Sequence, residues 1–265
     1  MNVLDLMRAM EEIAPTAFAA PWDNVGLLVG DPDRDVARVL LTIDCTRAVL
    51  DEALRARCDA IVSYHPPLFE AQKTFVAGSI AYEAARAALA VYSPHTALDA
   101  AEGGTNDVLA DAVGMTERAP VRDVAPRDGD REPPGAARRG FGRVGPVPRT
   151  TVLALAGAVK RALGATHVLV AGPADREITR VAVCAGSGGD LVQDAARAGA
   201  ELVLTGELRH HDALRARAAG MVAVCTLHSV SERAALVALE RRLAARMPGV
   251  HVVRSLEDRD PFVFV

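Results

Sequence analysis

Cysteine is scarce in this chain, and so are lysine, aromatic residues and long apolar runs. Four cysteines stand far apart among 265 residues, without a C-x-x-C pair. This spacing argues against disulfides and against zinc held by thiolates, so any metal would be held by His and carboxylate side chains. No apolar run approaches the roughly 18–20 residues that span a bilayer. The first 15 residues read as an amphipathic helix that contains acids, not as a signal peptide, and we expect a cytoplasmic protein.

The sequence has no large excess of positive or negative charge, so it lacks the positive excess that marks nucleic-acid-binding proteins. The net charge is −4, no run of five like charges occurs, and Lys73 and Lys160 are the only lysines. A nucleic-acid-binding protein usually carries a basic stripe, so a nucleic-acid partner is not expected. Half of the residues are hydrophobic, which is enough for a sizeable core. The length fits one large domain or two small ones.

Short β-branched runs alternate with Ala-, Leu- and Arg-rich helical patterns along most of the chain. Helices are predicted over 45–57 (with Thr46 as the N-cap), 78–90, 151–163, 190–199 and 231–247. Strands are predicted over 36–44, 59–63, 90–93, 177–186, 200–206 and 221–227. Strands separated by helices of this length are typical of βαβ units, so we expect an α/β fold with a mainly parallel sheet.

Two halves are predicted on either side of a break in this alternation. The break runs from Arg118 to Pro148 and holds six prolines and many charges, and its middle, 127–140, predicts an exposed linker. The expected halves are 1–126 and 141–265. They look related, because 37–65 aligns with 179–207 without a gap. Each aligned segment reads strand, helix, strand and then a polar residue, and two such halves would bring their polar strand ends into one cleft between them.

Histidines and carboxylates gather where predicted strands end. His65 follows the strand 59–63, His95 and Asp99 follow 90–93, and His228 and Glu232 follow 221–227. His228 and Glu232 are four residues apart at the start of a helix, so both can reach one ion from one helix face. Imidazole and carboxylate ligands suit Zn, Mn, Fe or Co better than Ca or Cu(I). Five such residues are enough for one metal, or for two metals that share a bridging carboxylate.

The motifs taken together resemble a known family, the Nif3-like family, whose members are also labelled GTP cyclohydrolase I type 2 homologues. The resembling segments cover nearly the whole chain in order: PWDNVGLLVG (21–30), DAIVSYHPPLF (59–69), VYSPHTALDAAEGGTNDVLA (91–110), GFGRVG (140–145), CAGSGGD (184–190), ELVLTGELRHHDAL (201–214), LHSVSE (227–232) and DRDPFVFV (258–265). The resemblance implies a two-domain α/β protein with a dinuclear metal centre, often a toroidal hexamer. Only a short linker separates the halves, so the chain resembles the short form without an inserted domain.

The resemblance also implies a ligand set. His65 and Asp99 would come from the first half and His228 and Glu232 from the second, with Glu232 bridging two metals. The chain departs from many bacterial members at Tyr64, where they carry a second histidine, and is similar there to eukaryotic-type members. A phenol with an ordinary pKa near 10 is a poor ligand unless a metal lowers that pKa. One metal or two therefore stay open, and a second ion would bind weakly or through His95.

Several neighbouring residues admit more than one role. His95 is either catalytic or a partner that orients a ligand, and Glu207 is either a general base or a structural hydrogen-bonding residue. The loop 185–190 fits a tight turn better than a phosphate-binding loop, because it lacks the P-loop and dinucleotide spacings. His210 and His211 are predicted in solvent or at a pocket rim, and Trp22 in a core or an interface.

Two classes of function remain from the sequence. The first is a metal-dependent hydrolase acting on a small, nucleotide-like substrate, with a GTP cyclohydrolase activity suggested by the family label alone. The second is a non-catalytic metal-binding scaffold, metallochaperone or regulatory partner, in which no substrate turns over. In either class the resemblance implies a homo-oligomer.

Overall fold

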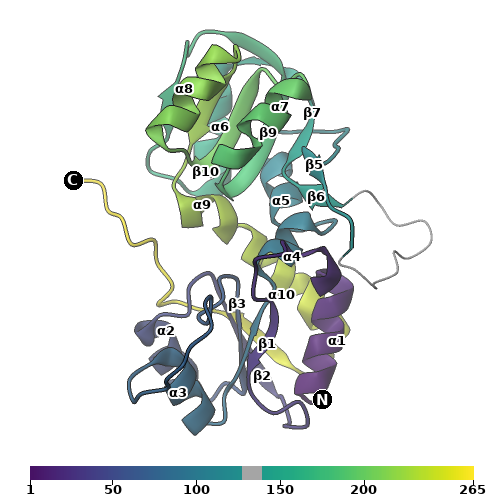
Figure 1. The fold of residues 1–265 in the computed structure, drawn as a ribbon, viewed down its shortest axis with the longest axis vertical. Coiled ribbons are helices and arrows are strands. Elements are labelled where there is room, and N and C mark those ends of the chain that lie inside the picture. The colour runs from purple at the N-terminus through teal and green to yellow at the C-terminus, as the bar shows by residue number, and fades with distance from the viewer. Residues whose placement is uncertain (127–138) are drawn as a thin grey trace. The chain divides into compact units, whose positions relative to one another are not determined.

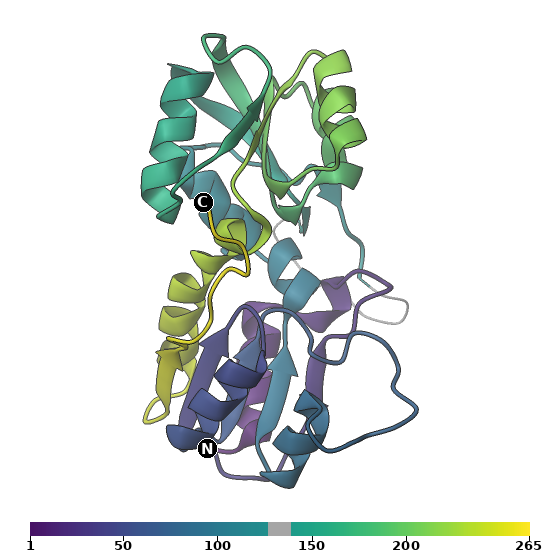
Figure 2. The ribbon, with the colours of Figure 1, turned by 90° about the vertical axis from the view of Figure 1, so that its left-hand side faces the viewer.

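The computed structural model describes residues 1–126 and 139–265, so the predicted linker lies almost entirely outside the described residues. The chain divides into unit 1, Met1–Leu98 with Leu236–Val265, and unit 2, Asp99–Ala235. This division differs from the expected halves, since 99–126 belong to unit 2 and 236–265 to unit 1. The end of the chain returns to the first sheet because β12 (His251–Arg254) pairs in parallel with β2 (Arg38–Thr42). Figure 2 shows this yellow strand beside β2.

Unit 1 is a five-stranded sheet with helices on both faces (Figure 1). The strand order is β1-β4-β3-β2-β12, in which β1 is antiparallel to its neighbour and the other pairs are parallel. Besides β2 and β12, the elements are α1 (Val3–Ile13), η1 (Thr16–Phe18), β1 (Gly26–Val29), α2 (Arg47–Arg55), β3 (Ala60–Ser63), α3 (Ile80–Arg86), β4 (Ala90–Ser93) and α10 (Ala235–Arg246). Helices α2 and α3 cover one face, and α1 and α10 cover the other.

Local sequence explains the central elements of unit 1. Thr46 caps α2, as predicted, because its hydroxyl accepts a hydrogen bond from the Val49 N–H at 3.4 Å. All four residues of β3 are buried, which fits a central strand covered on both faces. The expected helix at the start of the chain is α1, and Asn2 and Asp5 form a capping box there.

Unit 2 is a second five-stranded sheet, with the order β7-β9-β10-β11-β8. Its elements are α4 (His95–Ala100, which begins in unit 1), α5 (Thr105–Ala112), β5 (Arg122–Asp123), β6 (Gly140–Phe141), β7 (Arg143–Thr151), α6 (Val152–Leu163), β8 (Leu169–Ala171), β9 (Glu177–Ser187), η2 (Gly189–Leu191), α7 (Val192–Arg197), β10 (Leu202–Glu207), α8 (His210–Ala218), β11 (Val222–Cys225) and α9 (His228–Arg233). Helices α5 and α6 share one core with the sheet, and α7 and α8 share another.

The two sheets repeat one arrangement, as the internal alignment predicts. Val39 pairs with Ala60 and Val181 pairs with Leu202, so both parallel pairs join residues 21 positions apart. Three parallel strands followed by an antiparallel one occur in both, as β2-β3-β4-β1 and as β9-β10-β11-β8. The fifth strand differs, because β12 runs parallel to β2 whereas β7 runs antiparallel to β9. The predicted α/β class is therefore confirmed.

The structure corrects some details of the sequence reading. The predicted helix 231–247 is two helices, α9 and α10, and the first of them already begins at His228. Six strands have no counterpart among the predicted ones: β1, β5, β6, β7, β8 and β12. Strand β7 contains Pro146 and Pro148, which an edge strand tolerates because its outer N–H groups need no partner. None of the helices in the described ranges is long and apolar enough to cross a membrane.

Candidate metal centre

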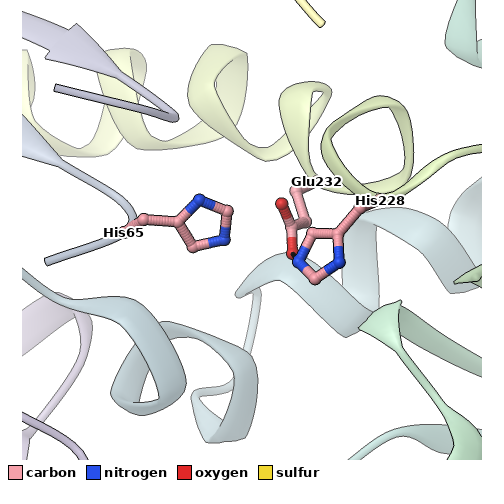
Figure 3. A group of neighbouring side chains, drawn as sticks. All are labelled: His65, His228 and Glu232. Atoms are coloured by element: carbon pink, nitrogen blue, oxygen red, sulfur yellow. Dashed lines mark ion pairs between the residues drawn. The ribbon is translucent and has the colours of Figure 1, made fainter. Parts of the chain in front are cut away.

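His228 and Glu232 lie on α9, which begins just after β11 ends. Their four-residue spacing puts both on one helix face, and His228 Nε2 is 3.1 Å from Glu232 Oε1. Figure 3 shows the two side chains close together. The Glu232 side chain is 3% exposed and the His228 side chain 38%. A buried carboxylate thus stands beside an imidazole that solvent can reach.

Glycines shape the space next to this pair. Gly186 has a φ of +66°, and a Cβ there would lie 2.5 Å from Glu232 Oε1 and 3.1 Å from His228 Nε2. A Cβ on Gly206 would lie 2.8 Å from the His228 Cα. The Gly186 N–H donates to Ser231 Oγ at 2.8 Å, which ties the end of β9 to α9. The close packing of the backbone at residue 186 against both candidate ligand atoms therefore depends on the absence of a side chain there.

Backbone strain marks the start of α9. Leu227 has a φ of +109°, which is an outlier for a branched aliphatic residue. Its N–H donates to the Gly206 carbonyl at 2.9 Å, so the sheet holds it in this conformation. Such a residue costs on the order of 1–3 kcal/mol and often occurs at functional sites. Here it turns the chain so that the next residue, His228, opens the helix.

Glu207 holds the other nitrogen of His228. His228 Nδ1 lies 3.1 Å from Glu207 Oε1, while Nε2 faces Glu232. A carboxylate on one ring nitrogen selects the tautomer whose other nitrogen can bind a metal. This contact fits the structural alternative for Glu207. A role as general base stays a prediction.

Two imidazoles of unit 1 show the same arrangement. His65 Nδ1 lies 2.9 Å from Asp44 Oδ1, and His95 Nδ1 lies 2.8 Å from Asp23 Oδ1. The two imidazole rings are neighbours, with centroids 5.3 Å apart. Each ring is oriented by its acid, so each presents Nε2 as the nitrogen for a further ligand. The third side chain drawn in Figure 3 is this His65.

Asp23 and Asp44 are site residues that sequence reasoning missed. The Asp23 side chain is fully buried, and the Thr96 N–H also donates to it at 3.1 Å. Burial raises the pKa of the Asp23 carboxyl, but the hydrogen bond and charge of His95, with the Thr96 donors, outweigh burial and hold that pKa below its ordinary value. Asp44 could have been found, because it follows β2 as His65 follows β3.

Tyr64 belongs to the same group of rings in unit 1. It is 1% exposed, and its ring centroid lies 5.1 Å from that of His65 and 5.7 Å from that of His95. The residue that stands in place of a second histidine thus packs against both imidazoles. Whether its phenol ever binds a metal stays a prediction.

Asp99 lies in unit 2, near the end of α4. Asn106 Nδ2 donates to the Asp99 carbonyl at 3.0 Å, and Asn106 Oδ1 accepts from the Ala185 N–H at 2.9 Å, which joins α4 to the end of β9. Burial, followed by the charges of Asp99, Asp190 and Glu232, raises the pKa of the Cys184 thiol far above its ordinary value. Asp99 and Glu232 therefore act on the same thiol, one residue before Ala185.

The remaining predicted residues lie as follows. All four cysteines are free thiols, as expected. In the predicted loop 185–190, residues 185–187 end β9 and residues 189–190 begin η2, and the side chains of Thr205 and Asp212 fill the space beside Gly188 and Gly189. His210 and His211 are exposed at the start of α8. Trp22 is not in a core, because it is 63% exposed.

The donor set of α9 fits a divalent metal. Ligand atoms that share one ion at about 2.0–2.2 Å stand roughly 2.8–3.6 Å apart at right or tetrahedral angles. The 3.1 Å between His228 Nε2 and Glu232 Oε1 lies in that range. Imidazole and carboxylate are ligands for Zn, Mn, Fe or Co. The acid on Nδ1 is a further feature of a metal site.

Comparison with known proteins assigns the chain to a family. A family model described as Duf34/NIF3 (NGG1p interacting factor 3) matches residues 1–261. The chain belongs to the Duf34/NIF3 family. This Duf34/NIF3 chain is 30% identical to a GTP cyclohydrolase 1 type 2 homolog of Clostridium perfringens over 271 residues, which covers all of both chains, so it is a short member. It is 34% identical to NIF3-like protein 1 of Drosophila melanogaster, covering 98% of this chain and 88% of that one.

Solved structures share the fold. A hypothetical protein of Staphylococcus aureus is 26% identical and superimposes with a TM-score of 0.89, covering 100% of this chain and 99% of that one. A Bacillus cereus protein related to NIF3 has a TM-score of 0.90 over the same shares at 21% identity, which shows the fold alone. The predicted resemblance to the Nif3-like family is confirmed.

Proposed function

We propose that this Duf34/NIF3 chain is a metal-dependent hydrolase acting on a nucleotide-like substrate. The observation that carries the proposal is the pair on α9, with Glu232 3.1 Å from one nitrogen of His228 and Glu207 3.1 Å from the other. An imidazole beside a buried carboxylate, with a second acid on its other nitrogen, is the arrangement of a metal ligand with its orienting partner. A purely structural contact between His228 and Glu232 would not need Glu207 on the other nitrogen of the imidazole.

The proposed ligand set is His65, Asp99, His228 and Glu232, as the family resemblance implies. Asp44 supports His65, because it holds Nδ1 and leaves Nε2 for a ligand. The common effect of Asp99 and Glu232 on Cys184 supports Asp99. Whether one divalent ion binds or two is part of the test below.

In the proposed hydrolysis, the residues around the metal centre would have separate roles. A bound divalent cation lowers the pKa of water and polarises an electrophile. Glu207 keeps His228 in one tautomer. His95, with Nδ1 held by Asp23, can accept or donate a proton at Nε2. The name of the Clostridium perfringens relative is the reason for proposing a nucleotide-like substrate.

Purified wild-type protein and Glu232→Gln test the proposal. We expect Glu232→Gln to lose at least about tenfold in affinity for Zn²⁺ or Mn²⁺, because an amide is a weaker ligand than a carboxylate, and to lose turnover with it. The measurements are calorimetric metal titration and activity on a panel of nucleotides and phosphoesters. Glu177→Gln is the matched control, since Glu177 is an exposed acid of unit 2 paired with Arg149.

The metal titrations and the activity assays have outcomes that distinguish the proposed functions. Equal metal affinity and equal turnover in wild type and Glu232→Gln would contradict the proposal. Tight metal binding without turnover on any panel member would favour the non-catalytic scaffold or metallochaperone instead. Glu207→Gln separates the roles of Glu207, because a positioning residue lowers metal affinity and a general base lowers turnover alone. Light scattering tests the homo-oligomer, for which the family resemblance implies a hexamer.

A further inference from the structure

Two aromatic side chains of unit 1 stand exposed beside His95. Trp22 is 63% exposed and Phe69 is 50% exposed, although aromatic residues make up 4% of the chain. Their ring centroids lie 5.8 Å apart. Both rings approach His95, with centroids at 6.0 Å for Trp22 and 6.4 Å for Phe69. The sole tryptophan of the chain thus lies on the surface, at an imidazole that the proposed chemistry uses.

The backbone that carries both rings is held by two polar residues between them. Asp23, next to Trp22, is buried and accepts hydrogen bonds from the Thr96 N–H and hydroxyl. Asn24 Nδ2 donates to the carbonyl of Leu68, next to Phe69, at 2.5 Å. The segment of Trp22 is therefore fixed to the start of α4 and to the connection between β3 and α3. That connection projects from unit 1 in Figure 2.

The imidazole beside these rings adds a polar group. Asp23 holds His95 Nδ1 at 2.8 Å, so Nε2 is the nitrogen that can meet a ligand. His65 is the next ring, 5.3 Å from His95 between centroids. An aromatic surface bordered by a hydrogen-bonding nitrogen is suited to a flat molecule with an apolar face and a polar edge.

We propose that Trp22 and Phe69 form a stacking platform for the planar heterocycle of the substrate, such as a purine base, whose polar edge meets His95. This inference rests on the proposed function and deepens it, because it names how the substrate is recognised. Exposed aromatic side chains are unfavourable in water, and stacking of a base on such a ring contributes about 1–3 kcal/mol. Stacking accepts many bases, because every base has a flat face.

The single tryptophan makes the test specific. Guanosine, adenosine and ribose 5-phosphate are titrated into the full chain while Trp22 fluorescence is followed, and equilibrium dialysis measures the same affinities. We expect saturable quenching by both nucleosides and none by ribose 5-phosphate. Phe69→Leu should weaken nucleoside binding at least about fivefold, because it removes one stacking face. Phe75→Leu is the matched control, since Phe75 is 58% exposed in the same connection, and it should bind as wild type does.

The platform and the metal centre can fail separately. Absence of saturable binding by either nucleoside would overturn the platform, and so would equal weakening by Phe69→Leu and Phe75→Leu. Quenching by ribose 5-phosphate with the same affinity would overturn it too, because that probe has no aromatic ring. Glu232→Gln should bind guanosine as the wild type does while losing metal affinity. If the wild-type protein binds metal but neither nucleoside, the platform is contradicted and the metal centre is not.

Discussion

At the residue scale, three histidines have the same feature: a carboxylate oxygen lies within hydrogen-bond distance of the ring nitrogen Nδ1. Asp44 holds His65, Asp23 holds His95 and Glu207 holds His228, all at 2.8–3.1 Å. A lone histidine at a strand end can rotate and can exist in either tautomer, whereas a held one presents a single nitrogen. The recurrence of this contact is a stronger sign of a functional centre than the histidines themselves.

Gly186→Ala should damage the metal centre without a change in any candidate ligand. A Cβ at this position would lie 2.5 Å from Glu232 Oε1, and the φ of +66° disfavours a side chain as well. We expect the affinity for Zn²⁺ or Mn²⁺ to fall at least about tenfold, which is the range seen when the surroundings of a ligand are disturbed. Calorimetric titration measures it.

The control for that substitution is Gly157→Ala in α6. A Cβ at Gly157 would meet nothing nearer than an Arg161 side-chain nitrogen at 3.6 Å, so alanine should stabilise the helix by roughly 0.5–1 kcal/mol and leave metal affinity unchanged. Equal metal affinity of the Gly186→Ala and Gly157→Ala variants would show that the space beside Gly186 is not part of a metal site.

Local sequence singles out the candidate ligands and Glu207, and it could have pointed to Asp44, but it could not point to Asp23. His65 and His228 follow strands, and the approach of strand ends is a property of the sheet that periodicity predicts. Asp23 lies 72 positions before His95, and no local pattern connects residues that far apart. The core alternative for Trp22 fails for a similar reason, because its exposure depends on how distant segments pack around Asp23, whereas the interface alternative stays a prediction.

At the scale of elements, each of the two sheets has a carboxylate at the start of a parallel strand pair. The carboxylate lies before one strand and accepts a hydrogen bond from a backbone N–H of the other. Asp59 Oδ2 accepts from the Arg38 N–H, and Glu201 Oε2 accepts from the Arg180 N–H, each at 3.0 Å. These residues correspond in the ungapped internal alignment. Agreement in a specific side-chain contact, beyond the βαβ pattern, supports descent of the two units from one ancestor.

Glu201→Gln should destabilise the chain in a pH-dependent way. Hydrogen bonds from the Thr179 and Arg180 N–H groups lower the pKa of Glu201 despite partial burial. The stabilisation is therefore complete above the unfolded-state pKa of about 4.3 and is lost as pH falls through the lower folded-state pKa. At pH 7 we expect a loss of about 1 kcal/mol in the free energy of unfolding, measured by urea denaturation.

That difference between wild type and Glu201→Gln should shrink below pH 4, where the wild-type carboxylate becomes protonated. A difference that stays constant from pH 7 to pH 3 would contradict this account. Glu177→Gln, which removes an exposed acid at the start of β9, should change the unfolding free energy by less than about 0.5 kcal/mol at either pH.

Strands with a clear apolar run could be predicted from the sequence. Short edge strands and helix breaks could not, because they depend on contacts with neighbouring elements. Strands β2, β3, β9 and β10 are buried apolar runs, and their prediction is confirmed. The antiparallel edges β1 and β8 are four and three residues long, too short for a period to stand out. The break between α9 and α10 falls in a run of good helix formers, so propensity alone predicts one long helix.

At the scale of the whole molecule, the order of the sequence does not match the order of the units. The last 30 residues complete unit 1, since β12 pairs with β2 and Arg242 of α10 donates to the Ile13 carbonyl at 3.2 Å. A reading along the chain places a boundary at a proline-rich stretch and cannot show that a distant segment returns. Unit 2 is therefore the continuous unit, and unit 1 is built from two pieces.

This arrangement predicts which fragments fold. A fragment of residues 99–235 holds a complete sheet with helices on both faces, so it should unfold cooperatively on heating. A fragment of residues 1–126 lacks α10 and β12 and should show no cooperative transition, because the edge of β2 and the face under α10 are left bare. Circular dichroism during heating measures both. A cooperative transition in 1–126 together with none in 99–235 would contradict the division.

The most direct test of the metal centre is anomalous diffraction from crystals of the full chain grown with Zn²⁺ or Mn²⁺. The account predicts an anomalous peak about 2.0–2.2 Å from both His228 Nε2 and a Glu232 carboxylate oxygen, and the number of peaks counts the metals. Crystals in which His228 and Glu232 are ordered and no peak lies beside them would contradict it.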